Sequence, residues 1–222
     1  MDLTDLAESI GHRFSDISHL ERALRHRSWC AENGGVESNE RLEFLGDAVL
    51  GWAIADLAFR RFPDVHEGRL SDLRKSVVNA TALARVATEL GIGPHISLGR
   101  GEAAGGGAEK ESILSDAFEA VLAAVYLDAG PDVAYALVER SVAPHLDDAV
   151  TLHFDHKTAL QELCARRGGA APVYLLTSTG PDHAKVFAAE VSVGDRVIGT
   201  GTGGSKKAAE QVAAAAGCDA LS

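Results

Sequence analysis

Residues 39–47 read NERLEFLGD, a segment that sets three carboxylates in an apolar frame. Glu40, Glu43 and Asp47 are three and four residues apart, so on a helix that turns about 100° per residue they share one side. The rest of the segment and its continuation are apolar: Leu42, Leu45, Val49, Leu50, Ile54 and Leu57. The pattern predicts a largely buried helix with its acids aimed at one target. Clustered carboxylates repel unless they are neutralised, and a divalent cation with hard oxygen ligands does this economically.

A second acidic pair lies downstream, in ESILSDAFE at residues 111–119. Asp116 and Glu119 are three residues apart, which places them on one helix face. The ten residues that follow, AVLAAVYLDA, are almost wholly apolar. Two helices that project acids from apolar bodies can form a carboxylate box in a helical core, as bundle proteins do at metal sites.

These segments together resemble the ribonuclease III family. NERLEFLGD matches the family signature without a departure, and ESILSDAFE fits its ESILxDxxE segment. FPDVHEG at residues 62–68 resembles a family loop with a further acid, here Glu67, and HRS at His26–Ser28 resembles a short motif before the signature. The resemblance covers essentially the whole chain. It implies a homodimeric endonuclease that cuts double-stranded RNA to 5′-phosphate and 3′-hydroxyl ends, usually in ribosomal precursor and structured messenger RNAs.

The resemblance also implies roles for the acids. The expected metal ligands are Glu43, Asp47, Asp116 and Glu119. Asp47 and Glu119 are the expected catalytic residues, while Glu40 and Glu67 are auxiliary acids near a second metal or its waters. Two metals about 3.5–4 Å apart can activate a water and stabilise a leaving oxygen. All-oxygen ligands favour Mg²⁺, with Mn²⁺ as a substitute. The alternative is that these acids form ion pairs with Arg41, Arg74 or Lys110.

Composition limits the other possibilities. The 222 residues suffice for one large or two small domains, and no apolar run approaches the roughly 18 residues of a membrane helix. The acidic, amphipathic start MDLTDLAESI does not resemble a secretory signal, and three scattered cysteines fit reduced thiols. We therefore expect a cytoplasmic protein with no membrane partner and no small-molecule cofactor.

The net charge of −11 argues against a nucleic-acid partner when it is taken as a whole. The charge is divided unevenly, however. Residues 1–150 hold 14 basic and 25 acidic side chains, whereas residues 151–222 hold 7 of each. Bound metal would offset part of the acidity of the first region. Any RNA affinity of the second region must come from the local placement of its basic residues.

The order of elements predicts an α+β chain of two domains: an all-α endonuclease domain at 1–149, a linker at 150–156 and a double-stranded RNA-binding domain at 157–222. Helical patterns cover Leu3–Ile10, Ile17–Leu24, Asn39–Phe62, Glu67–Leu90, Ser112–Asp128 and Pro131–Leu146. The glycine-rich stretch 99–108 lacks the GK[ST] ending of a P-loop. It is either a mobile connector or a loop that folds against substrate, with Lys110 supporting a phosphate or orienting an acid.

Beyond the linker the pattern becomes α-β-β-β-α, which matches a double-stranded RNA-binding domain. Its elements are a helix near Lys157–Arg166, strands at Val173–Thr179, Val186–Val193 and Arg196–Gly203, and a helix at Ser205–Ala216. GPDH at 180–183 and GSKKAAEQ at 204–211 resemble that domain's RNA-contact segments. Lys206 and Lys207 start a helix, which favours phosphate. The expected groove contacts come from Thr158, Gln161, Glu162 and His183, which would read shape over about 16 base pairs.

Phe44 lies between two expected ligands but on another face of the signature helix. Family members form homodimers through this region, and Phe44 resembles the aromatic side chain that they insert into the partner subunit. Two alternatives to a nuclease remain open: a non-catalytic RNA-binding regulator that keeps the fold, and a metal-dependent phosphohydrolase of small substrates. The complete set of carboxylates argues against the first, and the C-terminal RNA-binding pattern argues against the second.

Overall fold

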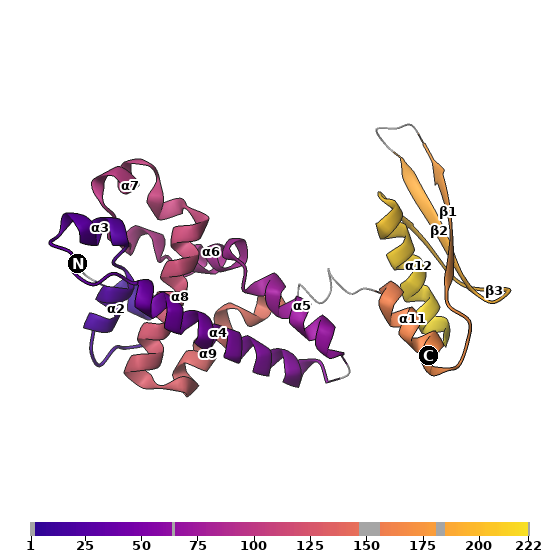
Figure 1. Ribbon diagram of the computed structural model, residues 1–222, viewed down its shortest axis with the longest axis horizontal. Coiled ribbons are helices and arrows are strands. Elements are labelled where there is room, and N and C mark those ends of the chain that lie inside the picture. Colours follow the sequence, from indigo (N-terminus) through magenta and orange to yellow (C-terminus); the bar gives the residue numbers. More distant parts are fainter. Residues whose placement is uncertain (1–2, 64, 147–155, 181–184, 222) are drawn as a thin grey trace. The chain divides into compact units, whose positions relative to one another are not determined.

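The computed structural model describes residues 3–63, 65–146, 156–180 and 185–221. The chain divides into two compact units, Met1–His153 and Phe154–Ser222 (Figure 1). Most of the linker predicted at 150–156 lies outside the described residues, as does His183. The domain boundary at 149/150 therefore stays a prediction, and each unit is described by itself.

The described part of the N-terminal unit is helical, apart from one parallel bridge between Arg25 and Ser97. Its α-helices are α1 (Thr4–Ile10), α2 (Ser18–Ala23), α3 (Arg27–Glu32), α4 (Glu40–Arg61), α5 (Glu67–Val77), α6 (Ala80–Glu89), α7 (Arg100–Ala104), α8 (Glu111–Ala129) and α9 (Pro131–Ser141). Two short 3₁₀ turns, η1 (Gly93–His95) and η2 (Gly107–Glu109), lie on either side of α7.

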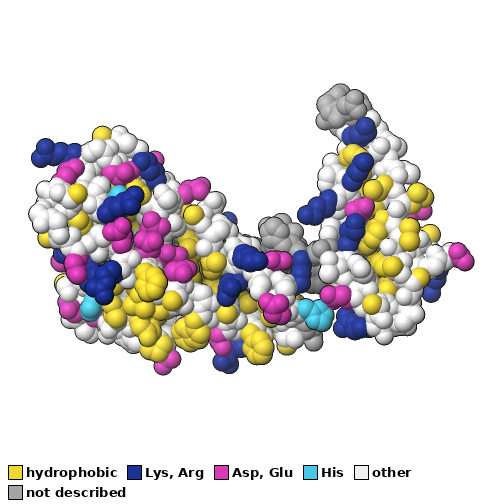
Figure 2. Space-filling view, in the orientation of Figure 1, with side chains coloured by type: hydrophobic (Ala, Val, Ile, Leu, Met, Phe, Trp, Pro, Cys, Tyr) yellow, Lys and Arg dark blue, Asp and Glu magenta, His cyan; other side chains and the backbone are white. Residues whose placement is uncertain are grey.

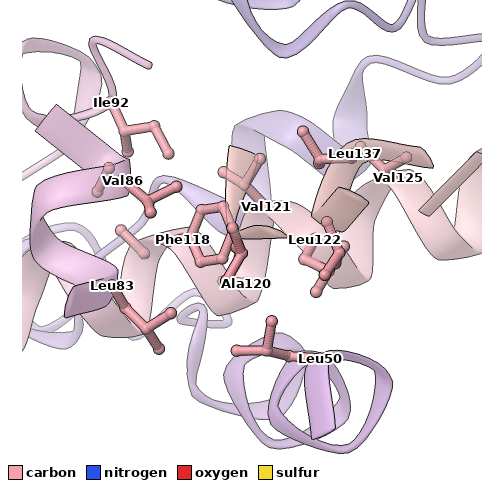
Figure 3. Packing of buried hydrophobic residues seen from close by; sticks show 14 of the residues in the cluster. Leu50, Leu83, Val86, Ile92, Phe118, Ala120, Val121, Leu122, Val125 and Leu137 are labelled. Carbon is pink, nitrogen blue, oxygen red and sulfur yellow. The ribbon is translucent and has the colours of Figure 1, made fainter. Parts of the chain in front are cut away.

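Helix α8 forms the centre of this unit. It is apolar on nearly every side, as expected of a helix surrounded by others, and Ala117, Phe118 and the run Ala120–Val125 are fully buried. The close view in Figure 3 shows Phe118 between Leu83 and Val86 of α6, with Leu50 of α4 nearby. The acids of α8 are therefore carried by the most rigidly packed helix of the unit.

Some predicted helices differ in detail from the observed ones; α9, for example, ends at Ser141 and not at Leu146. The helix expected at Glu67–Leu90 is two helices, because Asn79 has an extended backbone (φ −80°, ψ 159°) and its side chain accepts a hydrogen bond from the Ala82 amide. An asparagine in this geometry begins a new helix. The glycine-rich stretch also contains structure that was not predicted, α7 and η2, with Gly99 and Gly107 buried. The choice between a mobile connector and a loop that folds against substrate stays a prediction.

The C-terminal unit packs α11 (His156–Arg166) and α12 (Lys206–Leu221) on a three-stranded antiparallel sheet. Strands β1 (Val173–Thr179), β2 (Val186–Val193) and β3 (Arg196–Gly203) have the predicted bounds and lie in the order β1-β2-β3. Helix α12 continues to Leu221 instead of ending at Ala216. The core of this unit consists of Leu160, Cys164, Ala189, Val191, Ile198, Ala209, Ala213 and Ala214.

Candidate metal centre and RNA-binding surface

The acidic residues of the N-terminal unit come together where α4 packs on α8. Glu43 lies in the first turn of α4, and Asp116 and Glu119 face it from the first half of α8. One carboxylate oxygen from each of the three lies within 4.8 Å of the others, and all three side chains are half-buried. Three hard oxygen donors this close to one another match the ligand set of Mg²⁺, Mn²⁺ or Ca²⁺.

The fourth expected ligand, Asp47, lies at the edge of this group. It is exposed and does not share the 4.8 Å cluster. Its charge nevertheless acts on the cluster, because it is the largest electrostatic contributor among those that raise the pKa of Glu119. Asp47 is one helical turn beyond Glu43 on α4, which places the two acids on the same side of the helix.

The ionised forms of Glu119 and Glu43 are disfavoured in this cluster. Burial, followed by the charges of Asp47, Glu43 and Asp116, raises the pKa of Glu119 from 4.5 to about 8. Burial and then Asp116 and Glu40 also raise the pKa of Glu43. At neutral pH, without a cation, Glu119 therefore keeps a proton. A divalent ion would displace that proton and remove the repulsion at the same time.

The alternative of simple ion pairs is wrong for these acids. Within the described residues, Arg41 lies 4.0 Å from Glu37 and Lys110 pairs with Glu102, so neither neutralises the cluster. The ion pairs found in that part of the chain include none with Glu43, Asp47, Asp116 or Glu119. Among the described residues the charge of Arg27 acts on Glu43, but none of the four acids forms an ion pair, so a proton or a cation is left to balance their charge.

The two expected auxiliary acids lie in different places. Glu40 starts α4 beside the cluster, where it accepts a hydrogen bond from Ser38 Oγ at 2.7 Å and lies 4.0 Å from Arg27. Glu67 begins α5, and its carboxylate accepts from Ser71 Oγ at 2.9 Å. Since α5 begins just beyond the far end of α4, about 27 Å of helix separates that end from Glu43. The structure does not bring Glu67 to the cluster of its own chain.

Sequence reasoning gave no role to His26, which the structure places beside the acids. Burial lowers the pKa of His26, and the charges of Glu102, Asp116 and Glu40 act against that lowering. The HRS motif was the signal that could have identified it, but local spacing does not reveal which distant carboxylates a histidine faces.

A row of exposed apolar side chains runs along α4 next to the acids. Phe44 is 80% exposed, Trp52 48% and Phe59 71%, and their spacings of eight and seven residues keep them on one side of the helix. Trp52 contacts Tyr135 of α9, with ring centroids 5.6 Å apart. On the face of the N-terminal unit seen in Figure 2, acidic side chains gather next to exposed hydrophobic ones. Exposed apolar groups on this scale mark an interaction surface.

The expected RNA contacts of the C-terminal unit lie on the starts of its two helices. Lys206 and Lys207 are exposed in the first turn of α12, and Ser205 Oγ accepts a hydrogen bond from the Ala208 amide at 3.1 Å. On α11, Thr158 and Gln161 are exposed and Glu162 is half-buried. Lys157 of α11 binds Glu210 of α12 at 2.6 Å. This ion pair joins the helices and neutralises the acid nearest the two lysines.

No helix in the described ranges is long and apolar enough to cross a membrane. The sequence matches the family model described as ribonuclease-III-like at residues 16–146 and the double-stranded RNA binding motif at residues 156–221.

Similar proteins support the same assignment. Ribonuclease 3 of Mycobacterium tuberculosis is 56% identical over 207 residues, covering 91% of this chain and 86% of that protein. Ribonuclease 3 of Streptomyces coelicolor is 54% identical over 197 residues, covering 88% and 71%. The ribonuclease III nuclease domain of Campylobacter jejuni is a structural match with a TM-score of 0.61 and 38% identity, covering 64% of this chain and 97% of that one. The chain belongs to the ribonuclease III family and is an endoribonuclease that acts on double-stranded RNA.

Proposed function

We propose that Glu43, Asp47, Asp116 and Glu119 bind Mg²⁺ and that this centre hydrolyses the phosphodiester bond. The observation that carries the proposal is a set of carboxylate oxygens within 4.8 Å of one another that have no basic partner in the described residues. All the donors are oxygen, which favours Mg²⁺ and allows Mn²⁺ as a substitute. When bound, the metal would lower the pKa of a water and stabilise the departing oxygen.

The protein residues have distinct tasks in this proposal. Glu119 is carried by the buried helix α8, and burial followed by the neighbouring negative charges raises its pKa to about 8. A bound cation would offset these effects, so Glu119 would hold the ion as a carboxylate. Asp47 is exposed at the open edge, where it can reach both the cation and an arriving RNA phosphate group. Glu40, which lies beside Glu43, holds waters or a second metal.

RNA recognition is assigned to the C-terminal unit. Lys206 and Lys207, exposed at a helix start, suit phosphates that border the major groove. Thr158 and Gln161, exposed on α11, together with Glu162 suit 2′-hydroxyls of a minor groove. The proposal extends to His183, which lies outside the described residues. Such contacts read the shape of the duplex and not its sequence.

The apolar row on α4 is proposed as the contact of a two-fold dimer, with Phe44 as the residue that enters the partner. The matching Campylobacter jejuni nuclease domain carries a region described as involved in dimer formation. If the two-fold axis crosses the apolar row at a right angle to α4, the two α4 helices run antiparallel. That arrangement carries the far end of the partner's α4, and the Glu67 that follows it, toward this chain's cluster. Glu67 would then act as an auxiliary acid in trans, which explains its distance from Glu43 within one chain.

A dimer of this kind presents one acidic centre to each RNA strand. Cleavage of both strands then follows, with a short stagger and with 5′-phosphate and 3′-hydroxyl ends. Cytoplasmic ribosomal precursor RNA and structured messenger RNA are the proposed substrates, because they contain long paired regions. The alternative of a non-catalytic RNA-binding regulator is disfavoured by the similar proteins, which are named Ribonuclease 3.

Cleavage of a long RNA duplex, with and without Mg²⁺, tests the proposal. Glu119→Gln keeps the size of the side chain and removes one ligand charge. It should abolish cleavage while gel-shift affinity for the duplex stays unchanged. Glu109→Gln is the matched control, because Glu109 is exposed on η2 and outside the cluster. If Glu119→Gln cleaves the duplex as fast as the unsubstituted protein does, Glu119 is not a metal ligand. If the unsubstituted protein binds the duplex but does not cut it, the regulator is favoured.

A further inference from the structure

We propose that the segment His26–Ser28, together with Gly99, is a strap that fixes the spacing between the acids of α4 and those of α8. Ser28 and Gly99 are positioning residues in this proposal. The inference rests on the metal centre proposed above and adds a cause for its geometry.

Backbone contacts show what the strap joins. The His26 amide donates to the Ser97 carbonyl at 3.1 Å, and the Ser97 amide donates to the Leu24 carbonyl at 2.8 Å. The Asn39 amide, at the start of α4, donates to the Arg25 carbonyl at 2.9 Å. The segment Leu24–His26, which leads directly into the strap, therefore holds both the start of the helix that carries Glu43 and the chain that leads into α8.

The side chain of Ser28 connects His26 to Gly99 through hydrogen bonds. Its Oγ lies 2.8 Å from His26 Nδ1 and accepts a hydrogen bond from the Gly99 amide at 2.9 Å. Because the Ser28 amide donates to the same nitrogen, at 3.3 Å, Nδ1 is an acceptor, and the Ser28 hydroxyl donates its proton to it. These bonds fix the imidazole ring as an acceptor at Nδ1, with its proton on Nε2.

Gly99 leaves no room for a side chain at this point. A Cβ there would lie 2.7 Å from the Ser28 carbonyl oxygen and 2.7 Å from a Glu32 carboxylate oxygen. That carboxylate accepts a hydrogen bond from the Arg100 amide at 2.9 Å, which seats the start of α7 against α3. Glu102 of α7 then pairs with Lys110, the residue that precedes α8. The contacts thus continue from the strap to the helix that carries Asp116 and Glu119.

The metal site needs the spacing between α4 and α8 to be held, because its acids repel one another. Without a cation, the carboxylates of α4 and α8 repel one another, because one oxygen from each of Glu43, Asp116 and Glu119 lies within 4.8 Å of the others. Mg²⁺ demands near-ideal octahedral geometry, whereas Ca²⁺ accepts flexible and irregular sites. A loosened strap should therefore weaken Mg²⁺ binding more than Ca²⁺ binding. A residue that only stabilised the fold would affect the two ions alike.

The test compares Ser28→Ala with Ser28→Thr, which retains the hydroxyl, and with Ser9→Ala as a matched control. Ser9 also makes one long-range hydrogen bond, to the Leu90 carbonyl at 2.9 Å, but at a distance from the acids. Mg²⁺ and Ca²⁺ binding to the full chain is measured by calorimetry without RNA, with duplex affinity and thermal unfolding in parallel. Ser28→Ala should weaken Mg²⁺ binding about tenfold, the usual effect of removing an outer-shell contact. Ca²⁺ binding should change less, duplex affinity should hold, and Ser28→Thr should restore the wild-type value.

Glu119→Gln separates failure of this inference from failure of the proposed function. If Glu119→Gln loses metal binding and Ser28→Ala does not, the strap does not position the site. If Glu119→Gln binds Mg²⁺ as wild type does, the metal centre itself is misassigned. Should Ser28→Ala unfold, Ser28→Cys keeps the volume while weakening both hydrogen bonds, and the ratio of Mg²⁺ to Ca²⁺ affinity does not depend on the folded fraction. An unchanged ratio in that variant would overturn the proposal.

Discussion

A Cβ atom on Gly46 would lie 1.9 Å from the backbone carbonyl oxygen of Glu119. Helices α4 and α8 therefore touch through their backbones at this point, with no side chain between them. Glu43 precedes Gly46 by about one turn on the same helix, so the contact sets it directly across from Glu119. The glycine of the NERLEFLGD segment is thus as necessary to the cluster as the acids around it.

Replacing Gly46 with alanine should disrupt this contact. The obstructing atoms belong to a backbone inside the core and cannot rotate away, so the expected loss of unfolding free energy is at or above the upper end of the usual overpacking range, about 3 kcal/mol. Denaturant unfolding of the metal-free protein measures the change. Gly68→Ala on α5 is the control, because nothing lies within 4 Å of its added methyl group. It should be neutral or stabilising by up to about 1 kcal/mol. Equal stability of both variants would contradict the backbone contact.

The raised pKa of Glu119 predicts how stability depends on pH. Between its ordinary value of 4.5 and about 8, the folded protein holds a proton that the unfolded chain releases. The metal-free protein should therefore lose stability as pH rises through this window. The loss should be on the order of a few kcal/mol, since a tenfold change in an ionisation equilibrium corresponds to about 1.4 kcal/mol.

Denaturant unfolding in a chelator, at steps from pH 5 to pH 9, checks this prediction. Glu119→Gln should flatten the dependence, and Glu109→Gln should leave it as it is in the wild type. Saturating Mg²⁺ should also flatten it, because the metal replaces the proton. A wild-type protein whose metal-free stability rises across this window would show that Glu119 is ionised in the fold.

Much of this architecture follows from local spacing. The three strands had the predicted bounds because β-rich runs and the turns between them are readable from neighbouring residues. Helical periodicity predicted that Asp116 and Glu119 share a face of one helix, and the family resemblance implied that Glu43 of another helix belongs to the same site. The ionic partners of these acids could not be excluded from sequence, since any nearby arginine or lysine is a candidate until its position is known.

Two of the features that sequence reasoning missed depend on distant segments, whereas the third, a helix break, is a local capping contact. The break at Asn79 is a capping hydrogen bond that competes with an otherwise continuous helical pattern. Helix α7 is seated by Glu32, which lies 68 residues away in the chain. The separation of Glu67 from the cluster follows from the length and direction of α4. The motifs that contain Glu67 and Glu43 are each short and recognisable, but they do not give this distance. Neither the position of α7 nor the distance between Glu67 and the cluster can be read from a single window of residues.

Lys206 and Lys207 should control duplex affinity without affecting the catalytic centre. Replacing both with alanine should weaken binding to all duplex sequences alike. It should also reduce the slope of log affinity against log salt by about 1 for each phosphate that a lysine no longer neutralises. Fluorescence anisotropy over a salt series measures both quantities. Replacing both with arginine keeps the charges and should preserve the slope. If the alanine variant keeps the wild-type affinity and slope, the start of α12 does not contact RNA.

Phe44 offers a test of the proposed dimer. Its side chain is 80% exposed on the described chain, so its removal should cost the monomer little. If it enters a partner, Phe44→Ala leaves a cavity at the interface, and truncations of this kind cost about 3–5 kcal/mol in cores. A two-fold contact carries that loss twice. The monomer–dimer equilibrium should therefore shift strongly toward monomer in sedimentation, with double-strand cleavage lost in parallel and duplex binding retained by the C-terminal unit.

The control for this experiment is Leu127→Ala, which removes an apolar side chain that is 47% exposed on α8, away from the row on α4. It should sediment as the wild type does, because exposure alone does not make a contact. A Phe44→Ala protein that remains a tight dimer at nanomolar concentration would rule out Phe44 as the inserted residue. Trp52 and Phe59 would then remain as candidates, since they lie on the same side of α4 and a dimer formed through that side must bury at least one of them.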